Sequence, residues 1–264
     1  MLVNLMSKAR LKLLGRLGKT HWDARRDFSE LYLRGSGIEI GALHEPTPVA
    51  EGVEVKYVDR LTTEECLERY PHLRTTTIAS VDVVTDGFSL QAVADQSLDF
   101  VMAHHVLEHS DNPLQTLENW CRVLRPGGVL YFSVPLANET FDRGREITPW
   151  CHLVDDWELL RDRNPELVRS RNEAHYWDWV NVSMKNMAET DQRPLELTSQ
   201  ASKAKYVSHM LDIGHEIHFH TFSIESVREL AARFTEEVAP QMKRLRVVDS
   251  GGEGLVLLRK QEIQ

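Results

Sequence analysis

Short apolar runs alternate with amphipathic stretches between residues 37 and 135, which is the pattern of βαβ units around a parallel sheet. The apolar character of these runs suits strands that helices cover on both faces. The five expected strands span residues 37–41, 53–59, 81–85, 98–103 and 129–134. The pattern therefore predicts an α/β fold built on a parallel sheet.

Two helices carry legible start signals. The first spans residues 113–124, where Asn112 can cap the amino terminus, Pro113 fits the first helical position, and a Pro-Gly-Gly run ends the helix. The second spans residues 224–234 and begins after Ser223, another good capping residue. Both helices place their apolar side chains on one face, so each is expected to pack on the sheet.

The chain divides into four regions by pattern. Residues 136–215 lose the strand and helix rhythm and are rich in Trp, Arg, Asp and Asn, which favours an insertion or lid. Strands expected over residues 244–249 and 254–259 flank two glycines, so they can close the sheet as an antiparallel hairpin. The regions are a helical segment (1–36), a sheet core (37–135), the insertion (136–215) and a carboxyl-terminal part that completes the sheet (216–264).

The first 20 residues carry five Lys or Arg and no acid, with apolar side chains along one helical face. Such a helix can lie on an anionic membrane surface, or it can dock on its own domain or be partly disordered, and the second interpretation is favoured. Its leucines are interleaved with charges, so no signal peptide is expected. The longest apolar stretch, near residues 128–137, is about half of what a membrane crossing needs.

Charge and cysteine content narrow the class of partner and the compartment. A formal net charge of −9 over 264 residues disfavours a nucleic-acid substrate, because polyanions would be repelled. The three cysteines, Cys66, Cys121 and Cys151, are odd in number and lack metal-ligand spacing, which fits a reducing compartment. We therefore expect a cytoplasmic globular protein without a transmembrane segment.

Polar residues cluster where the first three expected strands end. Glu39 and Gly41 end the first strand, Asp59 ends the second, and Asp86 with Gly87 follows the third. Ligands of doubly wound sheets bind at the carboxyl ends of the strands, and an acid about 20 residues after the first turn can accept hydrogen bonds from ribose hydroxyls. Asp59 is thus the predicted ribose ligand. Acids at strand ends also cap loops, so a structural role stands beside the functional one for each.

Four stretches carry a family resemblance: IEIGALHEP (38–46), VEVKYVDR (53–60), SLDFVMAHHVLEH (97–109) and NPLQTLENWCRVLRPGGVLYFSVP (112–135). Together they resemble class I S-adenosylmethionine-dependent methyltransferases, in particular a branch found in glycan and secondary-metabolite pathways. The later FDRGREITPWCHLVDDW is similar to the continuation of that branch. The resemblance implies a Rossmann-like fold with a seven-stranded, mostly parallel sheet and an antiparallel C-terminal hairpin. It also implies that the core binds the cofactor and that the insertion covers the acceptor.

The same resemblance implies the residues that hold S-adenosylmethionine, with S-adenosylhomocysteine as the product. Glu39 and Gly41 would contact or support the methionine end, and Asp59 would hold the ribose. The remaining implied contacts are Asp86, Gly87 and Phe88 around the adenine, and His104 facing the cofactor. Such binding needs neither a metal nor a covalent step, so no metal ligand is predicted, while use of a divalent ion is left open.

The first turn departs from the family pattern. The usual turn reads GxGxG, whereas only Gly41 remains here. Pro46 and Pro48 exclude a regular helix directly after the strand, since each lacks a backbone donor and restricts its predecessor. Either a loop of different shape forms the pocket, which is favoured, or the chain is a non-catalytic relative that binds S-adenosylmethionine or acts as a scaffold.

Histidines offer two further hypotheses. The run from His105 to His109, with Glu108 between them, matches the inverted zincin pattern H-x-x-E-H and would indicate a zinc hydrolase. That reading is disfavoured because Pro113 leaves too short a helix and no third ligand is evident. His152 and His220 are the candidate general bases, since a neutral imidazole can take the proton from a hydroxyl. Two alternatives stand beside this role: His with Asp can hold a divalent ion that lowers the pKa of the acceptor hydroxyl, or the residues can bind one another in a polar lid.

The resemblance therefore implies a transferase that moves a methyl group by direct in-line displacement, with most of the rate gain coming from positioning. The expected acceptor is a small molecule or glycan, through a hydroxyl of a sugar or a sugar-containing metabolite. The sequence indicates no oligomeric state.

Overall fold

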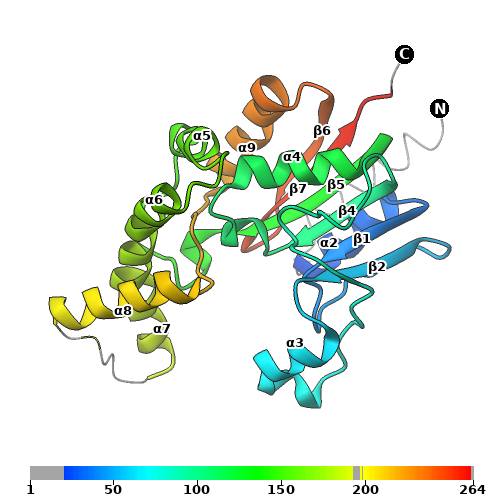
Figure 1. Cartoon of the computed structure of the whole chain (residues 1–264). Coiled ribbons are helices and arrows are strands. Elements are labelled where there is room, and N and C mark those ends of the chain that lie inside the picture. The colour runs from blue at the N-terminus through cyan, green and yellow to red at the C-terminus, as the bar shows by residue number, and fades with distance from the viewer. Residues whose placement is uncertain (1–20, 193–196, 198, 263–264) are drawn as a thin grey trace.

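The structure is a computed structural model that describes residues 21–192, 197 and 199–262, so the expected helix over residues 1–20 lies outside the described residues. Its strands are β1 (Ser36–Ile40), β2 (Glu54–Asp59), β3 (Val83–Val84), β4 (Leu98–His104), β5 (Leu124–Pro135), β6 (Met242–Asp249) and β7 (Glu253–Lys260). They form one sheet in the order β3-β2-β1-β4-β5-β7-β6 (Figure 1). β1 to β5 pair in parallel with one another, whereas β7 is antiparallel to β5 and to β6. The predicted Rossmann-like fold class is confirmed.

Two strands differ from their expected lengths. β3 has two residues instead of five, because Asp82 bonds to Tyr57 of β2 through both its backbone N–H and its carboxylate, in place of regular pairing. β5 begins at Leu124, five residues before the expected start, and pairs there with Leu98. The register shifts before Phe100, which lets the Pro-Gly-Gly run lie within the strand.

Helices cover the two faces of the sheet. α4 (Pro113–Val123) and α9 (Ile224–Arg233) pack on one face, and their start signals act as predicted: Asn112 accepts a hydrogen bond from Gln115 N–H, and Ser223 forms a capping box with Ser226. α2 (His21–Tyr32) covers the opposite face, where Phe28 and Leu33 contact β4, β5 and β7. The sheet is therefore the middle of three layers (Figure 1).

The insertion is a group of helices with its own apolar core. It contains α5 (Trp150–Leu159), α6 (Pro165–Asp178), a π-helical turn (Trp179–Ser183), α7 (Met184–Thr190) and α8 (Gln200–Ile213). Its core includes Tyr176, Val180 and Met210. α5 packs against α4 and α9, since its Trp150 and Leu153 belong to the same apolar cluster as those helices. α6, α7 and α8 stand beyond the end of the sheet to which β5 leads (Figure 1).

Shorter elements complete the chain. They are α3 (Thr63–Arg69), the 3₁₀ turns Pro71–Thr75, Leu107–His109 and Ala137–Glu139, and the π-helical turn Phe234–Val238. Among the residues that the structure describes, none of the helices combines the length and the apolar character needed to cross a membrane.

A buried polar network joins α2 to three strands. The carboxylate of Glu253 on β7 accepts hydrogen bonds from Arg25 Nε (3.0 Å) and Ser133 Oγ (2.7 Å), and lies 3.0 Å from His105 Nε2. Glu253 and Arg25 are both almost fully buried. Burial alone would raise the pKa of Glu253, but the hydrogen bonds from His105 and Arg25 outweigh it and hold the pKa well below its ordinary value.

We expect Glu253→Gln to lower the free energy of unfolding at pH 7 by about 3–5 kcal/mol, because Arg25 would keep a buried charge without its counter-ion. Denaturant unfolding monitored by circular dichroism measures the change. Because the pKa of Glu253 is lowered, its carboxylate adds stability at pH values above the ordinary pKa of 4.5. This stability is lost as the pH falls below 4.5. The difference in unfolding free energy between wild type and variant should therefore narrow at acidic pH.

Glu262→Gln, which changes an exposed carboxylate, is the matched control and should stay within about 0.5 kcal/mol of wild type. Equal unfolding free energies for Glu253→Gln and this control would contradict the role given to the network.

Candidate functional site

A pocket of about 230 Å³ opens at the carboxyl ends of β1, β2 and β4. This is the topological switch point, because the chain leaves β1 toward β2 on one side while β4 pairs on the other. The pocket is lined by Ile40, Gly41, Leu43, Asp59, Arg60, Leu61, Tyr70, Asp86, Gly87, Phe88, His105, Val106, His109 and Glu216. Five of the seven predicted cofactor residues are thus brought together, whereas Glu39 and His104 are not on its wall.

Asp59 ends β2 and presents its carboxylate to the pocket. One oxygen accepts a hydrogen bond from Leu61 N–H at 3.0 Å. Burial raises the pKa of Asp59, although this backbone bond and the Arg60 charge oppose the rise. A carboxylate accepts through two oxygens and several lone pairs, so one bond to the backbone leaves acceptor capacity for a ligand.

Asp86, Gly87 and Phe88 form a tight turn after β3. The Asp86 carboxylate accepts from Ser89 N–H at 3.0 Å, which is the capping role that acids at strand ends also have. A Cβ on Gly87 would lie 2.6 Å from the side chain of Ile40, so this position requires glycine. Trp120 Nε1 donates to the Gly87 carbonyl at 2.8 Å and fixes the turn against α4.

Gly41 and the loop after it replace the glycine-rich turn. Gly41 has φ of 67°, and its N–H donates to Val58 O. No helix follows within residues 41–52, as the two prolines predict. Glu39 on β1 anchors this loop. Its buried carboxylate accepts hydrogen bonds from Thr47 N–H and from Thr47 Oγ1 (2.6 Å). Burial raises the pKa of Glu39, and the Thr47 bonds oppose that rise. Glu39 therefore supports the pocket through the loop.

His104 points away from the pocket because side chains alternate along β4, which puts it on the same face as Phe100 and Met102. Its Nδ1 lies 2.9 Å from Ser133 Oγ, and its ring stands edge-on to Tyr131. Burial holds the pKa of His104 well below its ordinary value. The adjacent His105, in the left-handed region with φ of 55°, lines the pocket instead. The neighbouring pair of histidines marks this place in the sequence, but only the pleat decides which of them faces the ligand.

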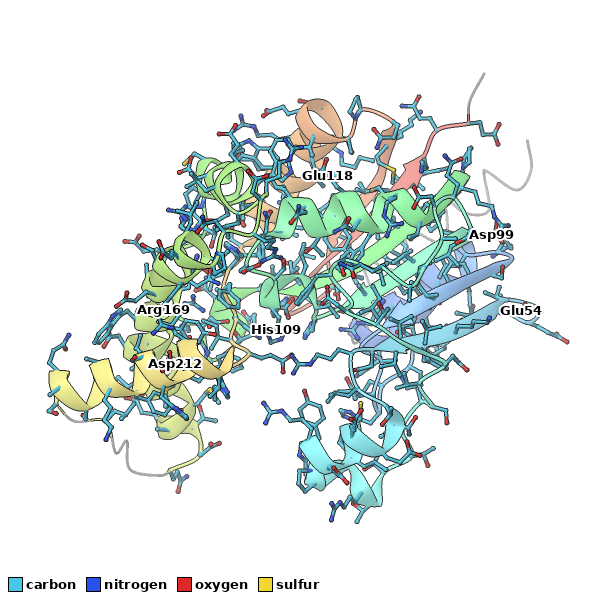
Figure 2. The ribbon with its side chains drawn as sticks, in the orientation of Figure 1. Glu54, Asp99, His109, Glu118, Arg169 and Asp212 are labelled. Atoms are coloured by element: carbon cyan, nitrogen blue, oxygen red, sulfur yellow. The ribbon has the colours of Figure 1, made fainter. Side chains whose placement is uncertain are left out.

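The lining residues that were not anticipated as ligand contacts include Arg60, His109 and Glu216. Arg60 and Glu216 form an ion pair of 2.9 Å, which links the end of β2 to the segment that follows α8. His109 lies between the ends of the strands and the helices of the insertion (Figure 2). Its Nδ1 is 3.0 Å from Ile217 O, so Nδ1 carries the proton and Nε2 has the free lone pair. Burial lowers the pKa of His109, so the ring is neutral at pH 7.

The zinc-hydrolase alternative loses its geometric basis. Leu107–His109 is a single 3₁₀ turn, and His105 bonds to Glu253. In the described part of the chain, one of the two groups of side chains that could hold a metal contains Glu108 and His109 together with His218, but neither group includes His105.

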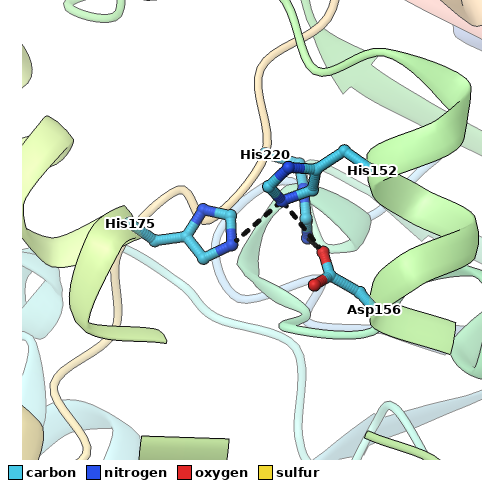
Figure 3. A group of neighbouring side chains, drawn as sticks. All are labelled: His152, Asp156, His175 and His220. Atoms are coloured by element: carbon cyan, nitrogen blue, oxygen red, sulfur yellow. Dashed lines mark hydrogen bonds and ion pairs between the residues drawn. The ribbon is translucent and has the colours of Figure 1, made fainter. Parts of the chain in front are cut away.

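His152 and His220, the predicted general bases, lie away from the pocket wall in a buried polar group. This group, the histidine cluster, consists of His152, Asp156, His175 and His220 (Figure 3). Burial lowers the pKa of His175 to about 4, and it holds the pKa of His220 well below its ordinary value. Burial would raise the pKa of Asp156, but hydrogen bonds and nearby charges outweigh it and lower the pKa.

Comparison with known proteins finds a family likeness in the core. Residues 49–132 match a family model described as a methyltransferase domain. This part of the chain is therefore similar to methyltransferase domains. The resemblance to class I methyltransferases is thereby confirmed, whereas membership of the glycan branch stays a prediction.

Curated relatives match the same kind of core over part of their length. The thiol S-methyltransferase TMT1B of Rattus norvegicus is 28% identical over 102 residues, which cover 37% of this chain and 42% of the relative. The human thiol S-methyltransferase TMT1A is 38% identical over 81 residues, which cover 30% and 32%. The chain therefore spans less than half the length of these relatives.

Two similar solved structures come from Thermotoga maritima and Aquifex aeolicus. A Thermotoga maritima S-adenosylmethionine-dependent methyltransferase, described as a possible histamine N-methyltransferase, is 14% identical with a TM-score of 0.44, covering 97% of this chain and 96% of its own. An Aquifex aeolicus methyltransferase is 13% identical with a TM-score of 0.43, covering 96% and 97%.

The contacts of Glu39 predict that Thr47→Val lowers the free energy of unfolding by about 1.5–3 kcal/mol at pH 7, because a hydrogen bond to a buried carboxylate is lost. The loss should shrink at acidic pH, where Glu39 is protonated and needs the bond less. Thr47→Ser keeps the hydroxyl and is the control. A loss in Thr47→Val no larger than the loss in Thr47→Ser, measured by denaturant unfolding, would contradict the role given to the hydroxyl bond.

Proposed function

We propose that this chain catalyses S-adenosylmethionine-dependent methyl transfer to a small-molecule acceptor, with the cofactor bound in the pocket at the ends of β1, β2 and β4. The observation that supports it most is the convergence of Gly41, Asp59 and the turn 86–88 on one pocket at the switch point of a methyltransferase core. These residues come from three separate strand ends, so their meeting is a property of the fold and not of one loop.

The residues fit the cofactor by shape and by donor chemistry. A Cβ on Gly41 would enter the pocket with only Val106 nearby, at 3.4 Å, so the bare backbone leaves room for a ligand. Asp59 would accept hydrogen bonds from the ribose hydroxyls, and the turn 86–88 would border the adenine with the ring of Phe88. Glu39 and His104 would act as positioning residues. Glu39 would act through its bonds to Thr47 in the loop after β1, and His104 through its contact with Ser133 on β5. When bound, S-adenosylmethionine supplies an electrophilic methyl group.

The proton of the acceptor needs a base on the pocket wall. His109 offers a neutral imidazole whose Nε2 lone pair is available because Nδ1 is bound to Ile217 O. We therefore assign the base to His109 in preference to His152 or His220, which lie in the histidine cluster. The hydrogen bond to Ile217 also orients the ring, so the lone pair is held ready for the acceptor.

The acceptor enters from the side of the insertion in this proposal. The insertion stands beyond the ends of the strands, and Glu216, on the segment that returns from α8, lines the pocket and pairs with Arg60. A sugar hydroxyl is the proposed acceptor on the family resemblance, and a thiol is the rival because the curated relatives are named thiol S-methyltransferases. The ordinary pKa of a thiol is about 8.5, so a thiol loses its proton easily. A hydroxyl acceptor therefore depends more on the base than a thiol acceptor does.

Titration calorimetry with S-adenosylhomocysteine tests the cofactor site. Asp59→Asn keeps the size of the side chain but replaces one acceptor oxygen by a donor, and it should weaken binding at least tenfold, or about 1.4 kcal/mol. Glu51→Gln, an exposed acid outside the pocket lining, should bind like wild type. Absence of binding to the wild-type chain would overturn the proposal; binding without methyl transfer to any hydroxyl or thiol would favour the scaffold.

His109→Gln should lower kcat by a factor of about 10² to 10⁴ for a hydroxyl acceptor while leaving the affinity for S-adenosylhomocysteine within a few fold of wild type. Burial lowers the pKa of His109 from the ordinary value of 6.5, so the imidazole is already neutral at pH 7. The rate of methyl transfer should therefore have reached its plateau by pH 7. Methyl transfer is measured by mass spectrometry against parallel panels of sugars and thiols. An unchanged kcat for the variant would remove His109 from the mechanism.

A further inference from the structure

The histidine cluster gathers four side chains from three separate segments. His152 and Asp156 lie four residues apart on α5, so they share one face of that helix. His175 comes from the last turn of α6, and His220 from the extended segment after α8. Figure 3 shows all four side chains turned toward one point between these segments.

The separations between their polar atoms are those of metal ligands. His152 Nε2 lies 3.3 Å from His175 Nε2 and 3.1 Å from Asp156 Oδ2, and His220 Nε2 lies 3.7 Å from the same oxygen. One ligand atom from each residue can be chosen so that all four are within 4.8 Å of one another. Bonds of about 2.0–2.2 Å in a tetrahedral zinc site place the ligand atoms about 3.3–3.6 Å apart.

Hydrogen bonds within the protein satisfy only some of these atoms. His152 Nε2 and His175 Nε2 are hydrogen-bonded to each other. Asp156 is fully buried and His220 is 1% exposed. Even so, Asp156 Oδ2 and both ring nitrogens of His220 have no hydrogen-bond partner. The contact between His152 and Asp156 is close but lacks the angles of a hydrogen bond. Buried polar atoms normally have partners, so several orphaned atoms aimed at one point indicate a missing ligand.

The surroundings orient Asp156 as a second shell orients a metal ligand. Arg171 Nε donates to Asp156 Oδ1 at 2.5 Å, which leaves Oδ2 for the centre of the cluster, and Asn112 Nδ2 donates to the Asp156 carbonyl. The main-chain carbonyl of Asp111 lies near the His220 ring and raises its pKa. This contact does not have the geometry of a hydrogen bond.

The donor set selects the kind of ion. Three imidazoles and one carboxylate suit a transition metal, whereas Mg²⁺ and Ca²⁺ prefer oxygen ligands. Arg171 offsets part of the negative charge, so affinity would rest on the nitrogen donors and not on charge attraction. Four protein ligands close a tetrahedral shell, which is typical of a structural zinc site and leaves no position for a substrate.

We propose that His152, Asp156, His175 and His220 bind one Zn²⁺ that fastens the insertion to the segment 215–223. That segment also carries Glu216 on the pocket wall and the Ile217 carbonyl that orients His109. The ion thereby stabilises the junction between the insertion and the pocket. The site is independent of the proposed methyl transfer and needs no cofactor.

The test uses the full chain, purified without a histidine tag, stripped with a chelator and then titrated with zinc. Elemental analysis before stripping should find about one zinc per chain, and zinc should raise the melting temperature of the stripped protein. Cobalt should give the intense visible absorption of a tetrahedral site. His152→Gln is the principal variant, because His152 is the most exposed ligand and its loss is the least disruptive to folding.

His152→Gln should bind zinc at least tenfold more weakly, measured by competition with a chromophoric chelator, and should lose the tetrahedral cobalt spectrum. His209→Gln, on exposed surface of α8, is the matched control and should behave like wild type. Asp156→Asn should also weaken binding. If wild type shows neither zinc retention nor a zinc-dependent rise in melting temperature, or if His152→Gln binds as wild type does, the proposal is overturned and the cluster is a purely hydrogen-bonding one.

Discussion

The parallel pairing of β1 with β4 is the constraint on which the pocket depends, because the chain continues from these two strands to opposite sides of the sheet. The strands approach so closely that a Cβ on Gly37 would lie 2.4 Å from Phe100. Their carboxyl ends therefore open side by side, with Gly41 above one and His105 above the other. Residues that are about 60 positions apart in the sequence become neighbours on one wall.

Buried charge is arranged differently in the two halves of the molecule. Around the sheet, the Glu253 carboxylate is matched by Arg25, Ser133 and His105, and the network joins α2 to the ends of β4, β5 and β7. In the histidine cluster, Asp156 and His220 keep orphaned atoms. The carboxylate of Glu253 is satisfied within the protein, whereas the proposed ion would satisfy the orphaned atoms of the histidine cluster.

The segment 215–223 connects these two regions. Glu216 reaches Arg60 across the pocket, the Ile217 carbonyl accepts from His109, and His220 enters the histidine cluster. Neighbouring residues of this extended segment thus bear on the cofactor pocket and on the insertion at once. Any change that shifts the insertion would be transmitted to the pocket through a few residues of backbone.

The sequence by itself determined the elements whose signals are local. α4 and α9 begin after Asn112 and Ser223 as their caps predict, the prolines prevent a helix after β1, and the glycine pair closes the last hairpin, because caps, dihedral limits and periodicity act over a few residues. The order of acids at strand ends also placed Asp59 and Asp86 at the pocket.

Only the tertiary structure decided the rest. Whether His104 or His105 faces the pocket depends on the pleat and register of β4, and the short β3 depends on how Asp82 meets Tyr57. The meeting of His152, His175 and His220 depends on how α5, α6 and the segment after α8 pack, over separations that no local pattern spans. Such contacts arise from long-range packing. Packing fixes the distances between side chains that are far apart in the sequence, and local sequence signals do not fix those distances.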